Sequence, residues 1–238
     1  PGLTMATEPG SDDGASVPTG EAADMRGASQ EMAMFPLGSV LLPSMLVSLH
    51  VFEDRYRTMV EHVLAAAEPT FGIVLIERGS EVGGGDVRTA IGCTARVLDA
   101  RAAPDGRWAL WCVGEERIRV LRWLAEDPYP RAMVERWPDP VPHDPVDLLR
   151  RCDPIQAAVQ RVAALSSELG GPALPDPFEL DADPVRRSYQ LGVAAPLGPL
   201  DRLAVLAAAD VSARLTLLAT LLAEQEELVR ARLSFGGD

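Results

Sequence analysis

The 238-residue sequence contains no lysine, and all 22 of its basic residues are arginines. This absence excludes several kinds of chemistry. A Walker A nucleotide-binding loop needs a lysine on the phosphates, and a Ser-Lys dyad, a Schiff base and a lysine general base need the same side chain. Arginine in place of lysine, together with abundant alanine, is typical of GC-rich coding, so we assign the composition no functional meaning.

Cysteine is also scarce. Cys93, Cys112 and Cys152 show no spacing typical of metal ligands, and any disulfide between two of them would leave the third unpaired. Buried free thiols in a reducing cytoplasm are the simpler interpretation. We expect no metal and no cofactor.

The sequence lacks a basic region. Its net charge of −13 divides as −4 over residues 1–30, −4 over residues 31–140 and −5 over residues 141–238. Non-specific affinity for nucleic acids comes mainly from basic side chains on phosphates, so nucleic acid is not an expected partner.

Long hydrophobic runs are missing as well. Leu215–Ala223 is interrupted by Thr216 and Thr220, and it is far shorter than the roughly 20 residues of a membrane span, so no membrane partner is expected. Residues 1–30 are rich in Gly, Ser, Pro, Ala and acidic residues, and they lack the apolar core of a signal peptide. They are predicted to form a disordered leader.

Residues 35–64 carry the clearest pattern of secondary structure in the chain. Pro36 favours an extended Phe35, and Pro43 ends the apolar run Val40–Leu42, which predicts a short strand followed by a loop. A second strand is predicted over Met45–Phe52. The hydrophobic period then changes to that of a helix, with one apolar face formed by Tyr56, Met59, Val60, Val63, Leu64 and Ala67.

Several closely spaced strands follow this first helix. Phe71–Glu77 predicts a buried central strand, and further strands are predicted over Ile91–Ala100, Arg107–Val113, Glu116–Leu124 and Arg131–Trp137. Short strands joined by turn signals such as Pro104-Asp105-Gly106 favour a small closed barrel or sandwich over a βαβ sheet.

Four prolines within eight residues, Pro138, Pro140, Pro142 and Pro145, predict a stiff linker before a helical region. The first helix of this C-terminal region either begins at Asp153-Pro154, or begins near Val146 and is kinked at Pro154. Further helices are predicted over residues 183–194, 199–208 and 210–233.

The segments FPL, VLLP and LHVFEDRYRTMV resemble, in order and spacing, the opening of the N-terminal domain of Lon proteases. The resemblance continues through FGIVLIERGSEVGGGDVRTAIGCTARV and PLDRLAVLAAADVSARLTLLATLL, so it covers most of the chain from about Glu31. It implies an α+β protein, with a PUA-like β-barrel domain at residues 31–138 and an all-α helical bundle at residues 145–234. It also implies a free-standing form of the substrate-recognition domain, without ATPase or peptidase domains.

The candidate catalytic and ligand-binding patterns are weak. The loop Gly83–Asp86 precedes a strand rather than the helix N-terminus that a phosphate cradle needs. His50, Glu53 and His62 match neither the H-x-x-x-H nor the H-E-x-x-H spacing of metal sites. No serine stands in a G-x-S-x-G context. We therefore expect no catalytic residues and no enzymatic activity.

Methionine and tryptophan concentrate in the predicted β-domain, where flexible thioethers fill cores and also serve promiscuous peptide-binding surfaces. The candidate peptide-binding residues are Met34, Met45, Trp111 and Trp123. We expect a non-catalytic module of protein quality control, an adaptor or chaperone-like factor that binds apolar segments of unfolded or substrate proteins. Whether a protease is also a partner stays open. An RNA-binding PUA-like protein and an unrecognised hydrolase are the alternatives.

Overall fold

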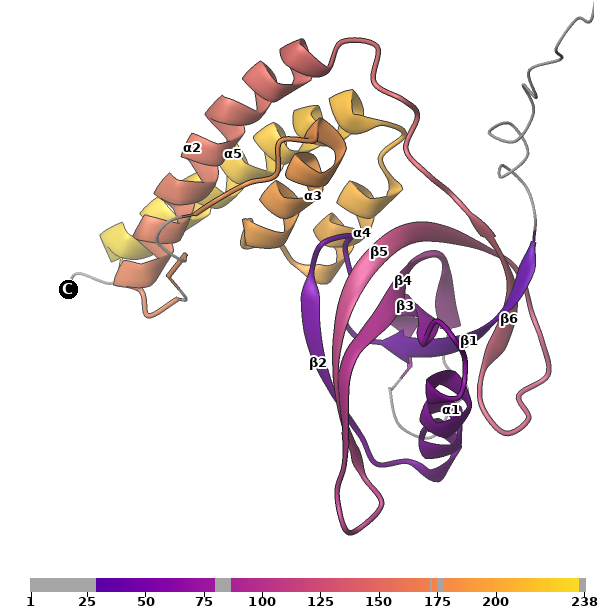
Figure 1. The fold of residues 1–238 in the computed structure, drawn as a ribbon. Coiled ribbons are helices and arrows are strands. Elements are labelled where there is room, and N and C mark those ends of the chain that lie inside the picture. Colours follow the sequence, from indigo (N-terminus) through magenta and orange to yellow (C-terminus); the bar gives the residue numbers. More distant parts are fainter. Residues whose placement is uncertain (1–28, 80–86, 172, 175–177, 236–238) are drawn as a thin grey trace, which may run out of the picture.

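The computed structural model describes residues 29–79, 87–171, 173–174 and 178–235. The predicted leader and the loop Gly83–Asp86 lie outside these residues. In the described part of the chain six strands precede four of the five helices (Figure 1). The strands are β1 (Gln30–Leu37), β2 (Leu46–Val51), β3 (Thr70–Arg78), β4 (Val87–Ala102), β5 (Trp108–Trp123) and β6 (Arg131–Arg136). The helices are α1 (Asp54–Leu64), α2 (Pro145–Glu168), α3 (Pro184–Ala194), α4 (Pro199–Ala207) and α5 (Val211–Phe235).

The sheet closes on itself as a small barrel. Its strand order is β2-β5-β4-β3-β1-β6, and a further pairing between β5 and β6 joins the ring. All neighbouring pairs are antiparallel except β1 and β3, which are parallel. The strand β2 stands outside the ring, paired with the first half of β5. The expected fold class, an α+β protein with a β-barrel and a helical part, is confirmed.

Two strand predictions are wrong in detail. Val40–Leu42 is not a strand but a buried loop, because Val40 and Leu42 pack against the C-terminal helices while Leu41 packs into the barrel core. The two strands predicted over Arg107–Val113 and Glu116–Leu124 are one continuous strand, β5. Within β5, Gly114 allows the Val40–Leu42 loop to lie close to the strand, since a Cβ there would lie 2.2 Å from the carbonyl oxygen of Leu42.

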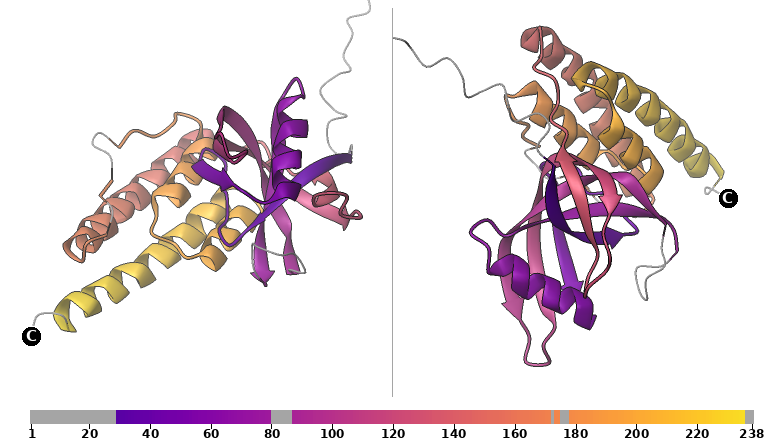
Figure 2. Two further views of the ribbon diagram at one scale, coloured as in Figure 1. Left: turned by 90° about the horizontal axis from the view of Figure 1, so that it is seen from below. Right: turned by 90° about the vertical axis from the view of Figure 1, so that its right-hand side faces the viewer.

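The helix α1 has the predicted apolar face. Its buried residues are Tyr56, Met59, Val60 and Val63, and they pack into one core cluster with strands β1–β5. Figures 1 and 2 show α1 against the barrel, away from α2–α5. At its N-terminus Arg55 Nε lies 3.1 Å from a Glu53 carboxylate oxygen, and the Glu53 side chain makes no capping hydrogen bond.

The helical part follows the sequence signals closely. Asp144 caps α2 by accepting a hydrogen bond from the Asp147 amide at 2.9 Å, so the earlier of the two predicted starts is the observed one. Pro154 lies inside this helix. Asp183 caps α3 and Asp210 precedes α5, as predicted.

The barrel and the helices share a hydrophobic core. One cluster joins Val40, Leu42 and Leu75 of the barrel side to buried residues of all four C-terminal helices. Figure 2 shows these helices gathered on one side of the barrel. The division into domains near residues 138–145 stays a prediction. None of the described helices combines the length and the hydropathy that a membrane span requires.

Candidate functional site

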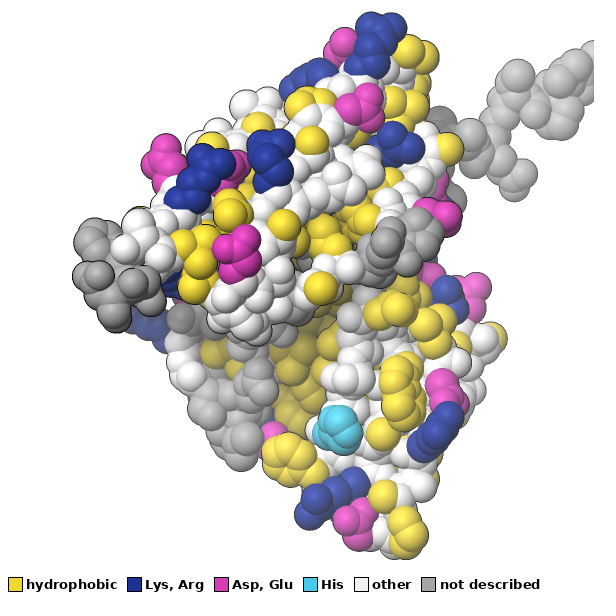
Figure 3. Space-filling model, turned by 90° about the vertical axis from the view of Figure 1, so that its left-hand side faces the viewer, with side chains coloured by type: hydrophobic (Ala, Val, Ile, Leu, Met, Phe, Trp, Pro, Cys, Tyr) yellow, Lys and Arg dark blue, Asp and Glu magenta, His cyan; other side chains and the backbone are white. Residues whose placement is uncertain are grey.

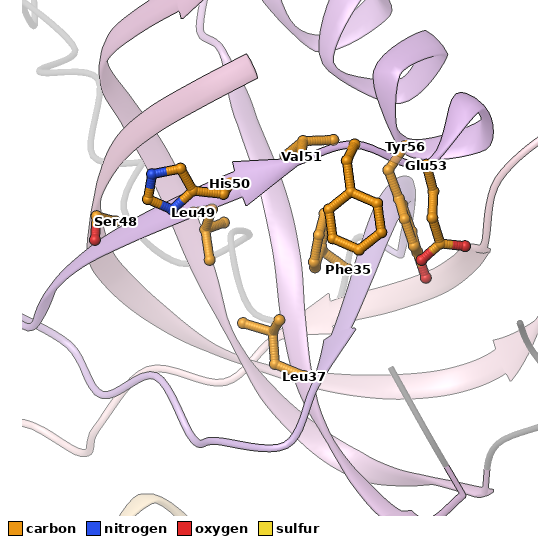
Figure 4. Close-up of a pocket in the computed structure, with 9 residues that line it drawn as sticks. Phe35, Leu37, Ser48, Leu49, His50, Val51, Glu53 and Tyr56 are labelled. Carbon is orange, nitrogen blue, oxygen red and sulfur yellow. The ribbon is translucent and has the colours of Figure 1, made fainter. Parts of the chain in front are cut away.

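A cavity of about 220 Å³ opens between β1 and β2 (Figure 4). We call it the seam pocket, and its lining residues are Phe35, Leu37, residues 48–53 and Tyr56. It exists because β2 leaves the barrel: in the part of the chain that the structure describes, β5 is the only strand paired with β2. The strand β1 therefore does not meet β2, and a slot remains between them.

The floor of the seam pocket is apolar. In Figure 4 the side chains of Phe35 and Leu37 on β1 lie opposite Leu49 on β2. Residues of β2 alternate between inside and outside, so Leu49 and Val51 are buried whereas Ser48 and His50 are exposed. Tyr56 closes one end with its ring 4.4 Å from that of Phe35.

Exposed apolar side chains lie at and near the rim of the pocket. Phe52, which lines the pocket, is 53% exposed, and Leu46 at the start of β2 is 70% exposed but does not line it. On the face that Figure 3 shows, hydrophobic side chains also gather in the hollow between the helices and the barrel. Contiguous exposed apolar surface in a folded domain is typical of a site that binds another protein.

The seam pocket contains a serine, a histidine and a carboxylate, so its catalytic potential must be considered. A nucleophile and its base need to be within hydrogen-bond reach, with the base oriented by a third group. The Glu53 carboxylate instead bonds Arg55 at 3.1 Å, and Figure 4 shows Phe35 between Glu53 and His50. No hydrogen bond joins Ser48, His50 and Glu53, all three of which are described. The arrangement is not that of a triad.

The four candidate peptide-binding residues do not converge. Met34 has no exposed area and packs beside Ile118, so it contacts no peptide in this conformation. Trp123, at the end of β5, is partly buried against the same cluster and stacks with Arg88, whose guanidinium carbon lies 4.5 Å from the ring centre. Met45 is partly buried between two core clusters.

Trp111 is the candidate that lies near the seam pocket. It is 42% exposed and pairs across the sheet with Ser48 of β2. Residues directly opposite in an antiparallel pair point to the same face, so Trp111 shares the outer face of the sheet with Leu46 and Ser48. The sequence signal that could have located the site was instead Phe52, a large apolar residue directly after the last residue of β2.

A second feature, unforeseen from the sequence, joins the barrel to the helices. Arg117 on β5 and Arg214 on α5 are both buried, and each has a guanidinium nitrogen on Asp139. Arg117 also donates to the carbonyl oxygens of Leu206 and Ala208, at 3.0 and 2.6 Å. Burial lowers the pKa of Arg117, although Asp139 opposes this effect.

The hollow beside these arginines measures about 790 Å³ and is lined by side chains of both charges. Arg96, Arg117 and Arg186 face it together with Glu115, Glu116, Asp139 and Asp183. Because the charges are mixed and the central ones are paired across the barrel–helix boundary, we assign this feature to folding rather than to ligand binding.

Known proteins resemble the chain over most of its length. Residues 31–224 match the family model described as the ATP-dependent protease La (LON) substrate-binding domain. Lon protease 2 of Sorangium cellulosum is 26% identical over 231 residues, which is 91% of this chain and 28% of the relative. Lon protease of Roseiflexus castenholzii is 26% identical over 203 residues, which is 83% of this chain and 24% of the relative. The chain thus spans less than a third of these relatives.

Solved structures give the same result. The Lon N-terminal domain protein from Xanthomonas campestris has a TM-score of 0.57 and 26% identity, covering 80% of this chain and 98% of that one. The N-terminal domain of a Mycobacterium avium complex Lon protease also has a TM-score of 0.57, with 16% identity over 82% of this chain and 98% of that one. At 16% identity, the similarity to the second structure is evidence for the fold alone.

Proposed function

Because the chain belongs to the family of Lon substrate-binding domains, we propose that it binds apolar segments of unfolded or substrate proteins at the seam pocket. Binding would be non-catalytic, as expected of an adaptor or chaperone-like module in protein quality control. Proteins bound in this way would be candidates for delivery to a protease.

The observation that carries the proposal is the exposed apolar rim beside an apolar cavity. Phe52 stands 53% exposed next to a floor of Phe35, Leu37 and Leu49. Burying a large apolar side chain of a partner stabilises a complex by about 1.5–3 kcal/mol before the costs of association. Several such contacts are needed for micromolar affinity, which a pocket with an apolar rim supplies.

The absence of catalysis is supported by the residue inventory. The 238 residues contain no lysine for a P-loop or a Ser-Lys dyad. We therefore expect purified protein to hydrolyse neither ATP nor peptides. Turnover that persists through purification and scales with protein concentration would contradict this expectation.

The binding test uses reduced, carboxamidomethylated lysozyme labelled with fluorescein, titrated with the full chain while fluorescence anisotropy is followed at 0.15 M salt. Phe52→Ser should weaken binding at least fivefold without lowering the melting temperature, since this side chain is exposed at the pocket. Leu121→Ser and Leu228→Ser are matched controls, because these leucines are 53% and 52% exposed but lie outside the seam pocket.

Trp111→Ala adds a second variant, on the outer face opposite Ser48. Equal losses in the site and control variants would show that binding is not localised at the seam pocket. No binding by the unaltered chain would overturn the proposed function itself.

A further inference from the structure

The free edge of β2 offers backbone hydrogen-bonding groups. The Gly114 amide donates to the Met45 carbonyl oxygen at 2.9 Å, which makes Met45 and Gly114 a hydrogen-bonded position of the β2–β5 pairing. Such positions recur at every second residue in an antiparallel pair. Val47, Leu49 and Val51 therefore direct their amides and carbonyls to β5, and Leu46, Ser48 and His50 direct theirs away from it.

These outward groups are available. For Leu46, Ser48 and His50 no backbone hydrogen bond to another described residue is found on this side of β2. The strand is exposed, since Ser48 and His50 both face solvent at the mouth of the seam pocket. An edge of this kind is a template for another strand.

The strand β1, which faces β2 across the seam pocket, lacks an amide donor at the position that would pair with β2. The Met34 amide donates to the Pro130 carbonyl oxygen at 2.9 Å, so on that edge of β1 the next residue in phase is Pro36. Proline has no amide hydrogen to donate. The backbone of β1 therefore does not close the slot, and the seam stays open for a chain from outside.

We propose that β2 binds a segment of the substrate protein as an added β-strand, whose inward side chains enter the seam pocket. The inference rests on the proposed function and adds to it the conformation and register of the bound segment. Strand addition uses backbone hydrogen bonds for affinity and pockets at alternate positions for selectivity. The family model describes a substrate-binding domain, and backbone recognition suits substrates of unrelated sequence.

The chemistry of the occupant follows from the slot. Its floor is apolar at Phe35, Leu37 and Leu49, so every second side chain of the segment is apolar. The chain carries a net charge of −13, so acidic segments are repelled and neutral or basic ones are preferred. A second copy of this chain, pairing β2 with β2, is the competing occupant.

The first test uses two isomeric peptides of alternating valine and threonine with terminal arginines, labelled with fluorescein. Each is N-methylated on one of the two alternate sets of amides, and both are titrated with the full chain alongside the unmethylated peptide. Only one set faces β2, because the apolar side chains pin the register. One isomer should bind at least tenfold more weakly than the other. Equal affinities would overturn strand addition.

The second test compares two substitutions at one position. His50→Pro removes an outward amide that β5 does not use, and proline is tolerated on strand edges. His50→Ala keeps that amide and removes the side chain. We expect the unmethylated peptide to bind His50→Pro at least tenfold more weakly and His50→Ala within about twofold of the unaltered chain. Similar losses in both variants would contradict the inference.

The outcomes separate the two proposals. If unfolded lysozyme binds and responds to Phe52→Ser while the two methylated peptides bind alike, the proposed function stands and strand addition fails. If sedimentation shows a dimer that His50→Pro dissociates, the edge belongs to a second copy and strand addition of substrates also fails. If His50→Pro does not fold, the methylated peptides decide the matter with the unaltered chain.

Discussion

Among the residues that the structure describes, Asp139 is the carboxylate that contacts both buried arginines. It lies 3.2 Å from Arg117 Nη2, contacts Arg214 Nη2, and accepts a hydrogen bond from the Tyr189 hydroxyl at 2.7 Å. Asp139→Asn leaves two buried cations without a counter-charge. Breaking a buried pair in this way costs about 3–5 kcal/mol, and we expect urea denaturation to show a loss of that size.

The matched control is Asp99→Asn, which breaks an exposed pair with Arg101. Exposed ion pairs contribute little, so this variant should lie within about 1 kcal/mol of the unaltered chain. Similar losses in the two variants would mean that the buried arginines find other partners.

The buried thiols predict a loss of stability at alkaline pH. All three cysteines are buried and free, and burial raises the pKa values of Cys112 and Cys152 to about 11. The unfolded thiols ionise near pH 8.5. Between about pH 9 and 11 the unfolded state therefore binds fewer protons than the folded state, so the free energy of unfolding falls as pH rises, by at most about 1.4 kcal/mol per thiol and pH unit.

Between pH 9 and 11 no lysine contributes to the pH dependence of the free energy of unfolding, because the sequence contains none. Burial also raises the pKa of Tyr189, which adds to the same slope. The free energy of unfolding is measured between pH 8 and 11 for the unaltered chain and for the double variant Cys112→Ala, Cys152→Ala. The variant should have the shallower slope, and identical slopes would contradict the assignment.

At the scale of elements, the contact between the loop Val40–Leu42 and β5 is specified by Gly114. A Cβ there would lie 2.2 Å from the Leu42 carbonyl oxygen, so Gly114→Ala must displace the loop from the strand. We expect a loss of about 1–3 kcal/mol. Gly72→Ala is the comparison, since the added methyl meets only the side-chain ends of Met34 and Ile118. A cost at Gly72 that exceeds the cost at Gly114 would be the contrary result in thermal melts.

The elements that the sequence predicts well are those with local signals. Asp183-Pro184 fixes the start of α3, because the cap and the first helical residue are adjacent. The loop Val40–Leu42 was missed for the opposite reason. A short apolar run bounded by proline has the composition of a strand. Its burial as a loop depends on contacts with helices that lie far away in the sequence.

The candidate site shows the same limit. Methionine and tryptophan content points to the barrel but not to a surface, since Met34 is core and Trp123 lies far along β5 from Trp111. The seam pocket depends on which strands do not pair. Pairing is set by contacts between distant segments, and no local period in the sequence records it.

At the scale of the whole molecule, the proposed boundary near residues 138–145 can be tested with a fragment that ends at Asp139. All four tryptophans precede that point, so the fragment should keep β-rich circular dichroism and tryptophan fluorescence. It should melt at a lower temperature than the full chain, because Val40, Leu42 and Arg117 lose their helical partners. A fragment without folded structure would show that barrel and helices form one cooperative unit.

The charge of the whole molecule predicts no binding to generic RNA. The net charge is −13, and many arginines of the barrel are engaged with carboxylates, among them Arg96 with Glu115 and Arg131 with Glu31. Few are left to release counterions from phosphates. Titration of labelled single-stranded RNA at 0.05 M salt should give no complex at micromolar protein, and a salt-sensitive complex would revive the RNA-binding alternative.

The pairing of β1 with β6 has a consequence for how the chain folds while it is being synthesised. Gln30 pairs with Val134, and the two residues are separated by more than a hundred positions. At a synthesis rate of about 5–20 residues per second, β1 waits roughly 5–20 s for that partner after it emerges from the ribosome. Its parallel partner β3 arrives sooner, at Thr70–Arg78. During translation the barrel is therefore an open sheet with an exposed apolar edge. In this state the chain itself is an incompletely folded protein, which is the kind of substrate that the finished protein is proposed to bind.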